Sequence, residues 1–283
     1  MGTDKSLNRN NQIIAVCLAL FSFIVSIFIW NWNGVDDYLV SLVLNGMYSS
    51  DNYCLFVNPV LCWMVKAMTH ILPSADCYLL IIRLVSLLSY YSISIVCLRR
   101  FPKRIAVTLL LTLCAISFSS LNYTTVTVFF IVSGMISIFD YLYSETKTKA
   151  GFIIGSILVF AGFILRQQSA LLMIPFFVLE LVAYILTHKK TFKRCIVPVS
   201  IVLGLIVVTV GINLYYQSLY EPNIYYNDMR TKLCDYPNKS WEEVESSLPD
   251  LTPNDYQSLH DFLLADTDRI DGDYLSSVAE VSS

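Results

Sequence analysis

Charged residues are scarce in this 283-residue chain. Asp, Glu, Lys and Arg make up 14% of it, whereas hydrophobic residues make up 55%. The apolar residues form long continuous blocks rather than amphipathic stripes, and no internal repeat or low-complexity segment accompanies them. Continuous apolar blocks of this length are typical of transmembrane helices. We therefore expect an all-α polytopic membrane protein.

Histidine and cysteine, two residue types that commonly bind metal ions, are few and scattered in the sequence. The three histidines, His70, His188 and His260, are too far apart to suggest a zinc site. The eight cysteines show no CxxC spacing, and about half of them fall in or beside apolar blocks, where a thiol behaves as a small apolar side chain. The others leave a disulfide open, but its pairing cannot be deduced from sequence: Cys54, Cys62, Cys77 and Cys234.

The apolar blocks predict seven spans, of which the fifth is short. They cover residues 12–30, 77–98, 105–121, 125–142, 150–165, 169–186 and 195–215. Two further helices, over 36–47 and from Asn58-Pro59 to about Pro73, are too short to span and are expected to lie along the membrane surface in the first outer loop. In the first of these, polar residues recur every four positions, at Asp37, Ser41 and Asn45.

Lys and Arg fall in every second loop, which predicts the orientation. Short basic loops stay on the cytoplasmic side, so the N-terminus is expected inside, whereas the loop of Asp36 and the C-terminal region are expected outside. A cleaved signal peptide is the competing interpretation of the first span, but no small-x-small site follows it. The expected location is a plasma membrane of bacterial type.

Charge also divides the chain into two predicted parts. Residues 1–216 carry 15 Lys and Arg against 8 Asp and Glu, a net charge of +7, and residues 217–283 carry 4 against 14, a net charge of −10. The second part has capping signals at Ser240 to Glu243 and at Thr252 to Asp255. We expect a transmembrane part followed by an acidic extracytoplasmic region of small helices.

Asp36 and Asp37 are the main candidates for a functional site. They follow the first span within a Trp-rich stretch, and carboxylates are costly to place close to hydrocarbon. Such a pair indicates a site that takes a proton or binds a metal. The alternative is that both are first-turn acids of a surface helix capped by Asn33, where the helix dipole favours them by about 0.3–1 kcal/mol.

Two arginines, Gln167 and Glu180 complete the candidates. Arg83 lies roughly 9 Å below the outer end of the second span at 1.5 Å per residue, where it either binds a phosphate or pairs with Asp76 or the Asp36 and Asp37 pair. Arg166, followed by Gln167, is expected at the outer tip of a hairpin, where it either binds a lipid phosphate or anchors the hairpin. Glu180 is expected to make an internal hydrogen bond or ion pair.

These features together resemble the conserved module of the GT-C superfamily of integral-membrane glycosyltransferases. The resemblance rests on an acidic pair after the first span, two surface helices in the first outer loop, seven spans and a long outer loop after the seventh. Five motifs are also similar to those of a group of uncharacterised bacterial multi-span proteins of that shape: Asp36-Asp-Tyr-Leu-Val, Asn45-Gly-Met-Tyr, Phe56-Val-Asn-Pro, Leu233-Cys-Asp-Tyr-Pro and Leu251-Thr-Pro-Asn-Asp.

The resemblance implies transfer of a sugar from a polyprenyl-phosphate carrier to an acceptor on the outer side. It implies that Asp36 or Asp37 acts as general base or holds a divalent cation, Mg²⁺ or Mn²⁺, and that Arg166 or Arg83, with Gln167, contacts the donor. The expected partners are membrane lipids and a polyprenyl-phosphate-linked sugar, and no nucleic acid is expected.

Two alternatives stay open beside this interpretation. Relatives continue into further spans, whereas this chain stops at Ser283 inside what corresponds to the loop after the seventh span, so a truncated and inactive module is one expectation. The other is a non-catalytic membrane protein that binds or moves lipid-linked sugars.

Overall fold

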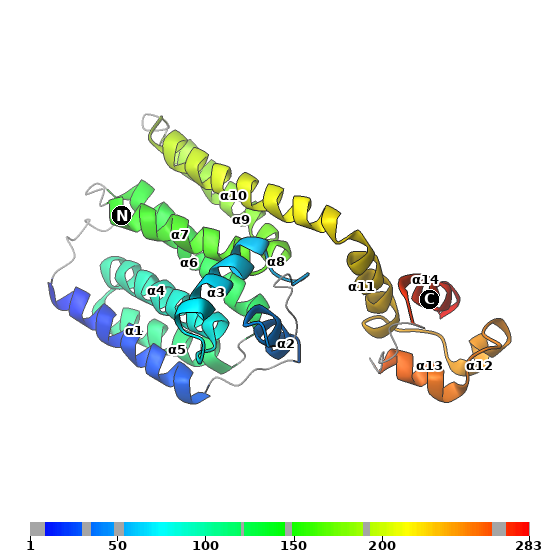
Figure 1. Ribbon diagram of the computed structural model, residues 1–283. Coiled ribbons are helices and arrows are strands. Elements are labelled where there is room, and N and C mark those ends of the chain that lie inside the picture. Colours follow the sequence, from blue (N-terminus) through cyan, green and yellow to red (C-terminus); the bar gives the residue numbers. More distant parts are fainter. Residues whose placement is uncertain are drawn as a thin grey trace. The chain divides into compact units, whose positions relative to one another are not determined.

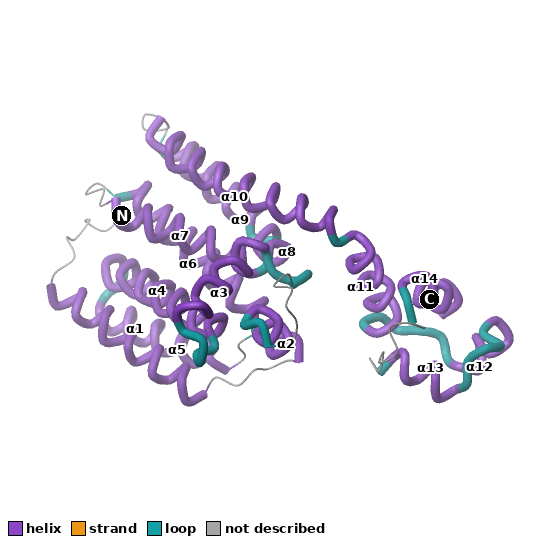
Figure 2. The backbone as a smooth tube through the Cα atoms, in the orientation of Figure 1, coloured by secondary structure: helices purple, strands orange, loops and turns teal. Residues whose placement is uncertain are grey.

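The computed structural model describes residues 9–29, 35–47, 54–119, 122–144, 149–188, 193–261 and 270–282. Within these ranges the secondary structure is helical throughout, and Figure 2 shows no strand among them. The helices are α1 (Arg9–Ile29), α2 (Val35–Leu44), α3 (Pro59–Ile71), α4 (Cys77–Arg100), α5 (Lys103–Ser119), α6 (Tyr123–Tyr143), α7 (Lys149–Leu165), α8 (Gln167–Leu171), α9 (Ile174–Thr187), α10 (Lys193–Leu219), α11 (Glu221–Cys234), α12 (Trp241–Val244), η2 (Glu245–Ser247), α13 (Pro253–His260) and α14 (Gly272–Ser282). The prediction of an all-α chain is confirmed.

Five helical segments are long and apolar enough to cross a membrane. They are Arg9–Phe28, Cys77–Arg100, Tyr123–Tyr143, Gln167–Thr187 and Cys195–Leu219. The two remaining predicted spans correspond to α5 and α7, which have 17 residues each and are shorter than a typical span of about 20 residues. The seven-span count therefore stays a prediction.

The observed helix boundaries differ from the predicted ones at two places. The predicted sixth span is interrupted, because α8 ends at Leu171 and a turn at Leu172 and Met173 precedes α9. The predicted seventh span stops too early, because α10 continues to Leu219. The apolar pattern ends near Leu214, but helical backbone does not require apolar side chains and extends beyond it.

The chain divides into two compact units, Met1–Asn213 and Leu214–Ser283. In the first unit α4 is central: it packs against α1, α5, α6 and α7, and α6 packs along α7 (Figure 1). Two buried clusters form its core. One joins α1 to α6 around Leu61, Tyr78 and Ile82, and the other joins α6 to α10 around Ile138 and Phe163.

Contacts between helix ends show that α4 and α6 run parallel to one another and that α1 and α7 run in the opposite direction. Asn11, at the start of α1, donates a hydrogen bond from Nδ2 to the carbonyl of Leu98 near the end of α4, at 3.3 Å. The ends of α4 and α6 meet through Arg99 and Asp140. Gly162, near the end of α7, lies against Ile131 in the first half of α6. One end of the unit therefore gathers the starts of α1 and α7 and the ends of α4 and α6.

Close backbone approach joins α6 to α7. A Cβ added to Gly134 on α6 meets the carbonyl oxygen of Gly155 on α7 at 2.7 Å, and a Cβ added to Gly155 meets the carbonyl oxygen of Gly134 at 2.7 Å. Small residues at helix contacts let backbones approach closely, as they do in membrane helix pairs. Glycine at both positions therefore sets the distance between these two helices.

The two short helices of the first loop form as the capping signals predict. Gly46, with φ of 74°, ends α2, and the N–H of Met47 bonds to the carbonyl of Leu42 at 2.9 Å, which is the C-terminal pattern that glycine favours. Asn58 caps α3 by accepting from the N–H of Val60. The same Asn58 donates from Nδ2 to the carbonyl of Thr209 on α10.

The second unit has a small core of its own. It contains Leu233 of α11, Val244 of α12, Leu259 of α13 and Leu275 of α14, all buried. The capping box predicted at Ser240 with Glu243 is present, and Thr252 is the predicted N-cap of α13 with Pro253 at the first helical position. The prediction of small helices in the acidic region is confirmed for the described residues.

Candidate functional site at the N-terminus of helix α6

Asp37 is buried, with 1% of its surface exposed, and its carboxylate faces the first turn of α6. Oδ1 accepts a hydrogen bond from the backbone N–H of Tyr123 at 2.9 Å. The first N–H groups of a helix have no partner inside the helix, and the helix dipole favours a negative charge there. Asp37 therefore connects α2 to the start of α6. The capping alternative had instead expected it to stabilise the N-terminus of its own helix.

Asp36 belongs to α2, but its side chain lies outside the described residues, and so does Asn33. The structure therefore does not test whether Asp36 acts as base or cation ligand. Among the described residues, no group of three or more His, Cys, Asp and Glu side chains is arranged to hold a metal ion. A divalent cation at the acidic pair stays a prediction.

The polar positions of α2 face other parts of the first unit rather than solvent. Ser41 is buried, and Ser41 and Asn45 donate to Asp76 at 2.8 Å each. On the same helix the apolar Leu39 is 42% exposed, and Met47, just beyond its end, is 69% exposed. The four-residue polar period was found from the sequence, but its partners are the starts of other helices rather than water.

Asp76 is the polar centre of this arrangement, and the sequence analysis gave it only a pairing role with Arg83. It caps α4 by accepting from the N–H of Leu79 at 2.9 Å, and the N–H of Cys77 is bound by Asn45 Oδ1 at 3.0 Å. An Asp directly before a long apolar run is a recognised helix-start signal. The sequence therefore contained the signal that predicts Asp76 as the N-cap of α4.

Arg166 lies at the same end of α6 as Asp37. Its guanidinium carbon is 4.5 Å from the ring centre of Tyr123, and Nη1 donates to Oγ1 of Thr124. Arg166 lies between α7 and α8, where the sequence predicts the tip of a hairpin. The neighbouring Gln167 has a buried Oε1 that accepts no hydrogen bond from the described residues. The structure thus brings Asp37 and Arg166 to the two sides of one helix start.

Arg83 and Tyr78 lie on α4 near this helix start. Arg83 lies within electrostatic range of Asp76, one of the partners that the structural interpretation of Arg83 names, and an ion pair between them stays a prediction. Tyr78 is fully buried and lies within electrostatic reach of Asp37, Asp76 and Tyr123. Tyr78 was missed in the sequence because a Tyr at the start of an apolar run carries no signal of its own.

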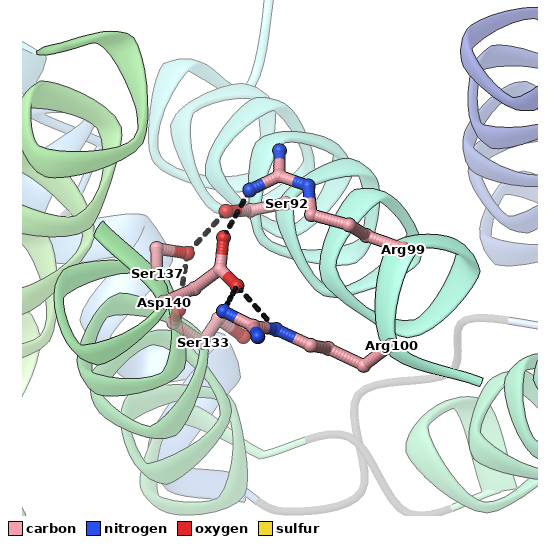
Figure 3. A network of polar contacts seen from close by, with 6 residues as sticks. All are labelled: Ser92, Arg99, Arg100, Ser133, Ser137 and Asp140. Atoms are coloured by element: carbon pink, nitrogen blue, oxygen red, sulfur yellow. Dashed lines mark hydrogen bonds and ion pairs between the residues drawn. The ribbon is translucent and has the colours of Figure 1, made fainter. Parts of the chain in front are cut away.

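The other end of the first unit holds a second polar group (Figure 3). Asp140 of α6 lies between Arg99 and Arg100 at the end of α4, with N to O distances of 2.5 Å and 2.7 Å. Beside it, Ser92 and Ser137 share a hydrogen bond across α4 and α6. Further along, Glu180 accepts from the hydroxyl of Tyr143 at 3.1 Å, so the internal hydrogen bond expected for Glu180 is confirmed.

The described residues therefore form a helical protein with five helices apolar and long enough to cross a membrane and with polar clusters at both ends of its first unit. No family model, no curated protein and no solved structure matches the chain.

Proposed function

We propose that this chain is an integral-membrane protein of the GT-C glycosyltransferase type. In this proposal it transfers a sugar from a polyprenyl-phosphate-linked donor to an acceptor on the extracytoplasmic side of a bacterial plasma membrane. The observation that supports it best is that Asp37, Arg166 and Tyr123 meet at the start of α6. A helix N-terminus with an arginine beside it favours an anionic phosphate group.

The two aspartates have different roles in this proposal. Asp37 is engaged by the N–H of Tyr123 and is a positioning residue that holds α2 against α6. Asp36, its neighbour in α2, is the general base for the acceptor hydroxyl or the ligand of a divalent cation. This division of roles accounts for two adjacent carboxylates: one holds α2 in position, and the other acts as the base or the cation ligand.

Arg166 is the proposed contact for the donor phosphate. It makes one hydrogen bond within the described residues, to Thr124, and a guanidinium has five N–H donors. The remaining donors suit a phosphate, which an arginine binds with two parallel hydrogen bonds. Arg83 is the second candidate for this contact, and Gln167, with its buried amide oxygen, is expected to orient a donor hydroxyl.

The test is transfer from radiolabelled polyprenyl-phosphate sugars by the purified chain in detergent. Asp36→Asn is expected to lower turnover by roughly 10²- to 10⁴-fold, the range of acid and base groups, while the melting temperature stays at the parent value. Arg166→Lys keeps the charge but loses the paired hydrogen bonds, so we expect a higher KM for the donor. Asp250→Asn, an exposed acid of the second unit, is the matched control. Full activity of Asp36→Asn rejects Asp36 as the base.

A non-catalytic protein that binds lipid-linked sugars is the second candidate, and the capping role of Asp37 favours it. A buried carboxylate that accepts from a helix N-terminus has a structural task without any chemistry. This candidate predicts that the parent binds a polyprenyl-phosphate sugar, that Arg166→Lys weakens that binding, and that no variant transfers the sugar. Release of free carrier phosphate by the parent contradicts it.

A further inference from the structure

A cavity of about 260 Å³ lies at the end of the first unit that carries Arg99 and Asp140, remote from the start of α6. Residues of α1, α4, α6 and α7 line it, among them Gln12, Tyr91, Ser92, Arg99 and Gly151. A water molecule takes about 30 Å³ of liquid volume, so this space admits a group several times larger. Most of the polar side chains around it are able to donate hydrogen bonds.

The charge beside this cavity is positive. Among the described residues that line it, Asp140 is the one carboxylate, and it accepts from Nη1 of Arg99 and from Nε and Nη2 of Arg100, the last two at 2.9 and 2.7 Å. Two guanidinium groups thus share a single carboxylate, which leaves a net charge of +1. Figure 3 shows the carboxylate of Asp140 between both arginines.

Arg99 is the group that connects this excess charge to the cavity. It belongs to the cavity lining, and its side chain is only 13% exposed. It makes one hydrogen bond within the described residues, to Asp140, so most of its N–H donors are available to a ligand. A guanidinium that is mostly buried and only partly satisfied is costly unless an anion completes its hydrogen bonds.

We propose that this cavity binds a phosphate-bearing anion, with Arg99 as its principal contact. Phosphate matches the donor geometry of arginine, and the hydroxyl of Tyr91 adds a further donor. Lys103 begins α5, close in sequence to Arg99, and Lys149 begins α7. Basic pockets between membrane helices bind anionic lipid headgroups, so a headgroup is the expected source, with free phosphate as the other source of the same chemistry.

The experiment measures binding heats for the purified full chain in nonionic detergent. The probes are inorganic phosphate, dihexanoyl phosphatidylglycerol and, as a lipid of no net charge, dihexanoyl phosphatidylcholine. Arg99→Gln removes the ligand contact but leaves Asp140 paired with Arg100, so the fold keeps its ion pair. Gly151→Leu fills the cavity without changing charge; the first added carbon meets only the carbonyl of Ser137, at 3.7 Å. Arg104→Gln, at an exposed position outside the lining, is the matched control.

We expect the parent and Arg104→Gln to bind an anionic probe and to prefer phosphatidylglycerol over phosphatidylcholine. Arg99→Gln is expected to bind that probe about tenfold more weakly or worse, because a charged hydrogen bond is lost. Gly151→Leu is expected to show a similar loss, because the added side chain occupies the cavity. Tighter binding of phosphatidylglycerol than of phosphate identifies a headgroup, and equal binding identifies the free anion.

Three results overturn the proposal: a parent that binds neither phosphate nor phosphatidylglycerol more tightly than phosphatidylcholine, an unchanged affinity in Arg99→Gln and Gly151→Leu, or an equal loss in Arg104→Gln. Thermal unfolding of each variant in the same detergent shows that the compared proteins are folded. The assay needs no sugar transfer, so failure of the proposed transferase activity leaves this result unaffected.

Discussion

At the scale of single residues, buried and half-buried acids of the first unit begin or connect helices. Asp37 serves the start of α6 and Asp76 the start of α4, and both interactions involve residues of α2 or its end. Buried carboxylates are stabilised when backbone N–H groups complete their hydrogen bonds. The start of α6 and the start of α4 are thereby fixed relative to the loop that carries Asp36.

Removal of the Asp37 carboxylate is expected to destabilise the first unit. Asp37→Ala leaves the N–H of Tyr123 without its acceptor, which costs about 1–3 kcal/mol of the free energy of unfolding. Asp37→Asn keeps an acceptor oxygen and loses the attraction between the charge and the helix dipole, so its cost is smaller, about 0.3–1 kcal/mol. Thermal unfolding in detergent measures both, with Leu39→Ala on the exposed face as control. Equal stability of parent and Asp37→Ala contradicts the capping role.

At the scale of helices, the strongest structural constraint is the contact between α6 and α7. Gly134 and Gly155 face one another so closely that an added Cβ on either lies within 2.7 Å of the carbonyl oxygen of the other. In a lipid environment, where apolar side chains gain little by leaving the solvent, such close backbone packing provides much of the attraction between helices. The position of Arg166 at the end of α7 depends on this contact.

Gly134→Ala is expected to separate α6 from α7 and to lower stability. The added carbon lies 2.7 Å from the carbonyl oxygen of Gly155 and 2.9 Å from the N atom of Val159, both backbone atoms that move only with the helix. Overpacking of this kind costs about 1–3 kcal/mol. Gly204→Ala on α10 is the matched control, since nothing lies within 4 Å of its added carbon, and helix propensity favours Ala there by up to about 1 kcal/mol. The measurement is the melting temperature of each variant in detergent. A drop for Gly204→Ala equal to that for Gly134→Ala contradicts the packing argument.

At the scale of the whole molecule, basic residues are more numerous at one end of the first unit than at the other. Arg9, Arg100 and Lys149 lie at the starts of α1 and α7 and at the end of α4, which the helix contacts place together. Asp37 and Asp76 lie at the starts of α6 and α4, at the other end. An excess of basic residues marks the cytoplasmic side of a membrane protein. The same asymmetry underlies the proposed orientation.

The proposed orientation has a direct test in reporter fusions. A reporter that is active only outside the cytoplasm is expected to work when fused after Ser74 or Asn238 and to fail after Arg100 or Lys190, because basic loops are retained inside. The readout is reporter activity normalised to the amount of fusion protein in the membrane fraction. Reporter activity after Lys190 would place that loop outside the cytoplasm. An odd number of spans would then precede it, and the prediction of seven spans would be wrong.

The sequence by itself determined that the chain is helical and where most of its helices begin. Length and apolar content marked α4, α6 and α10, and local signals marked their neighbours, such as Asn58 before α3 and Ser240 before α12. These predictions succeed because a helix start depends on a few adjacent residues. The exact ends were less accurate at α8, α9 and α10, since the residues that end a helix are weaker signals than those that begin it.

Only the tertiary structure decided which residues meet. Asp37 and Tyr123 are far apart in the chain, as are Asn58 and Thr209, and no local pattern encodes either hydrogen bond. The same holds for the direction of the polar stripe of α2, which faces other helix starts because their unpaired N–H groups need acceptors. Periodicity defines the faces of a helix, but the partner of each face depends on how the helices pack, and that is a property of the folded chain alone.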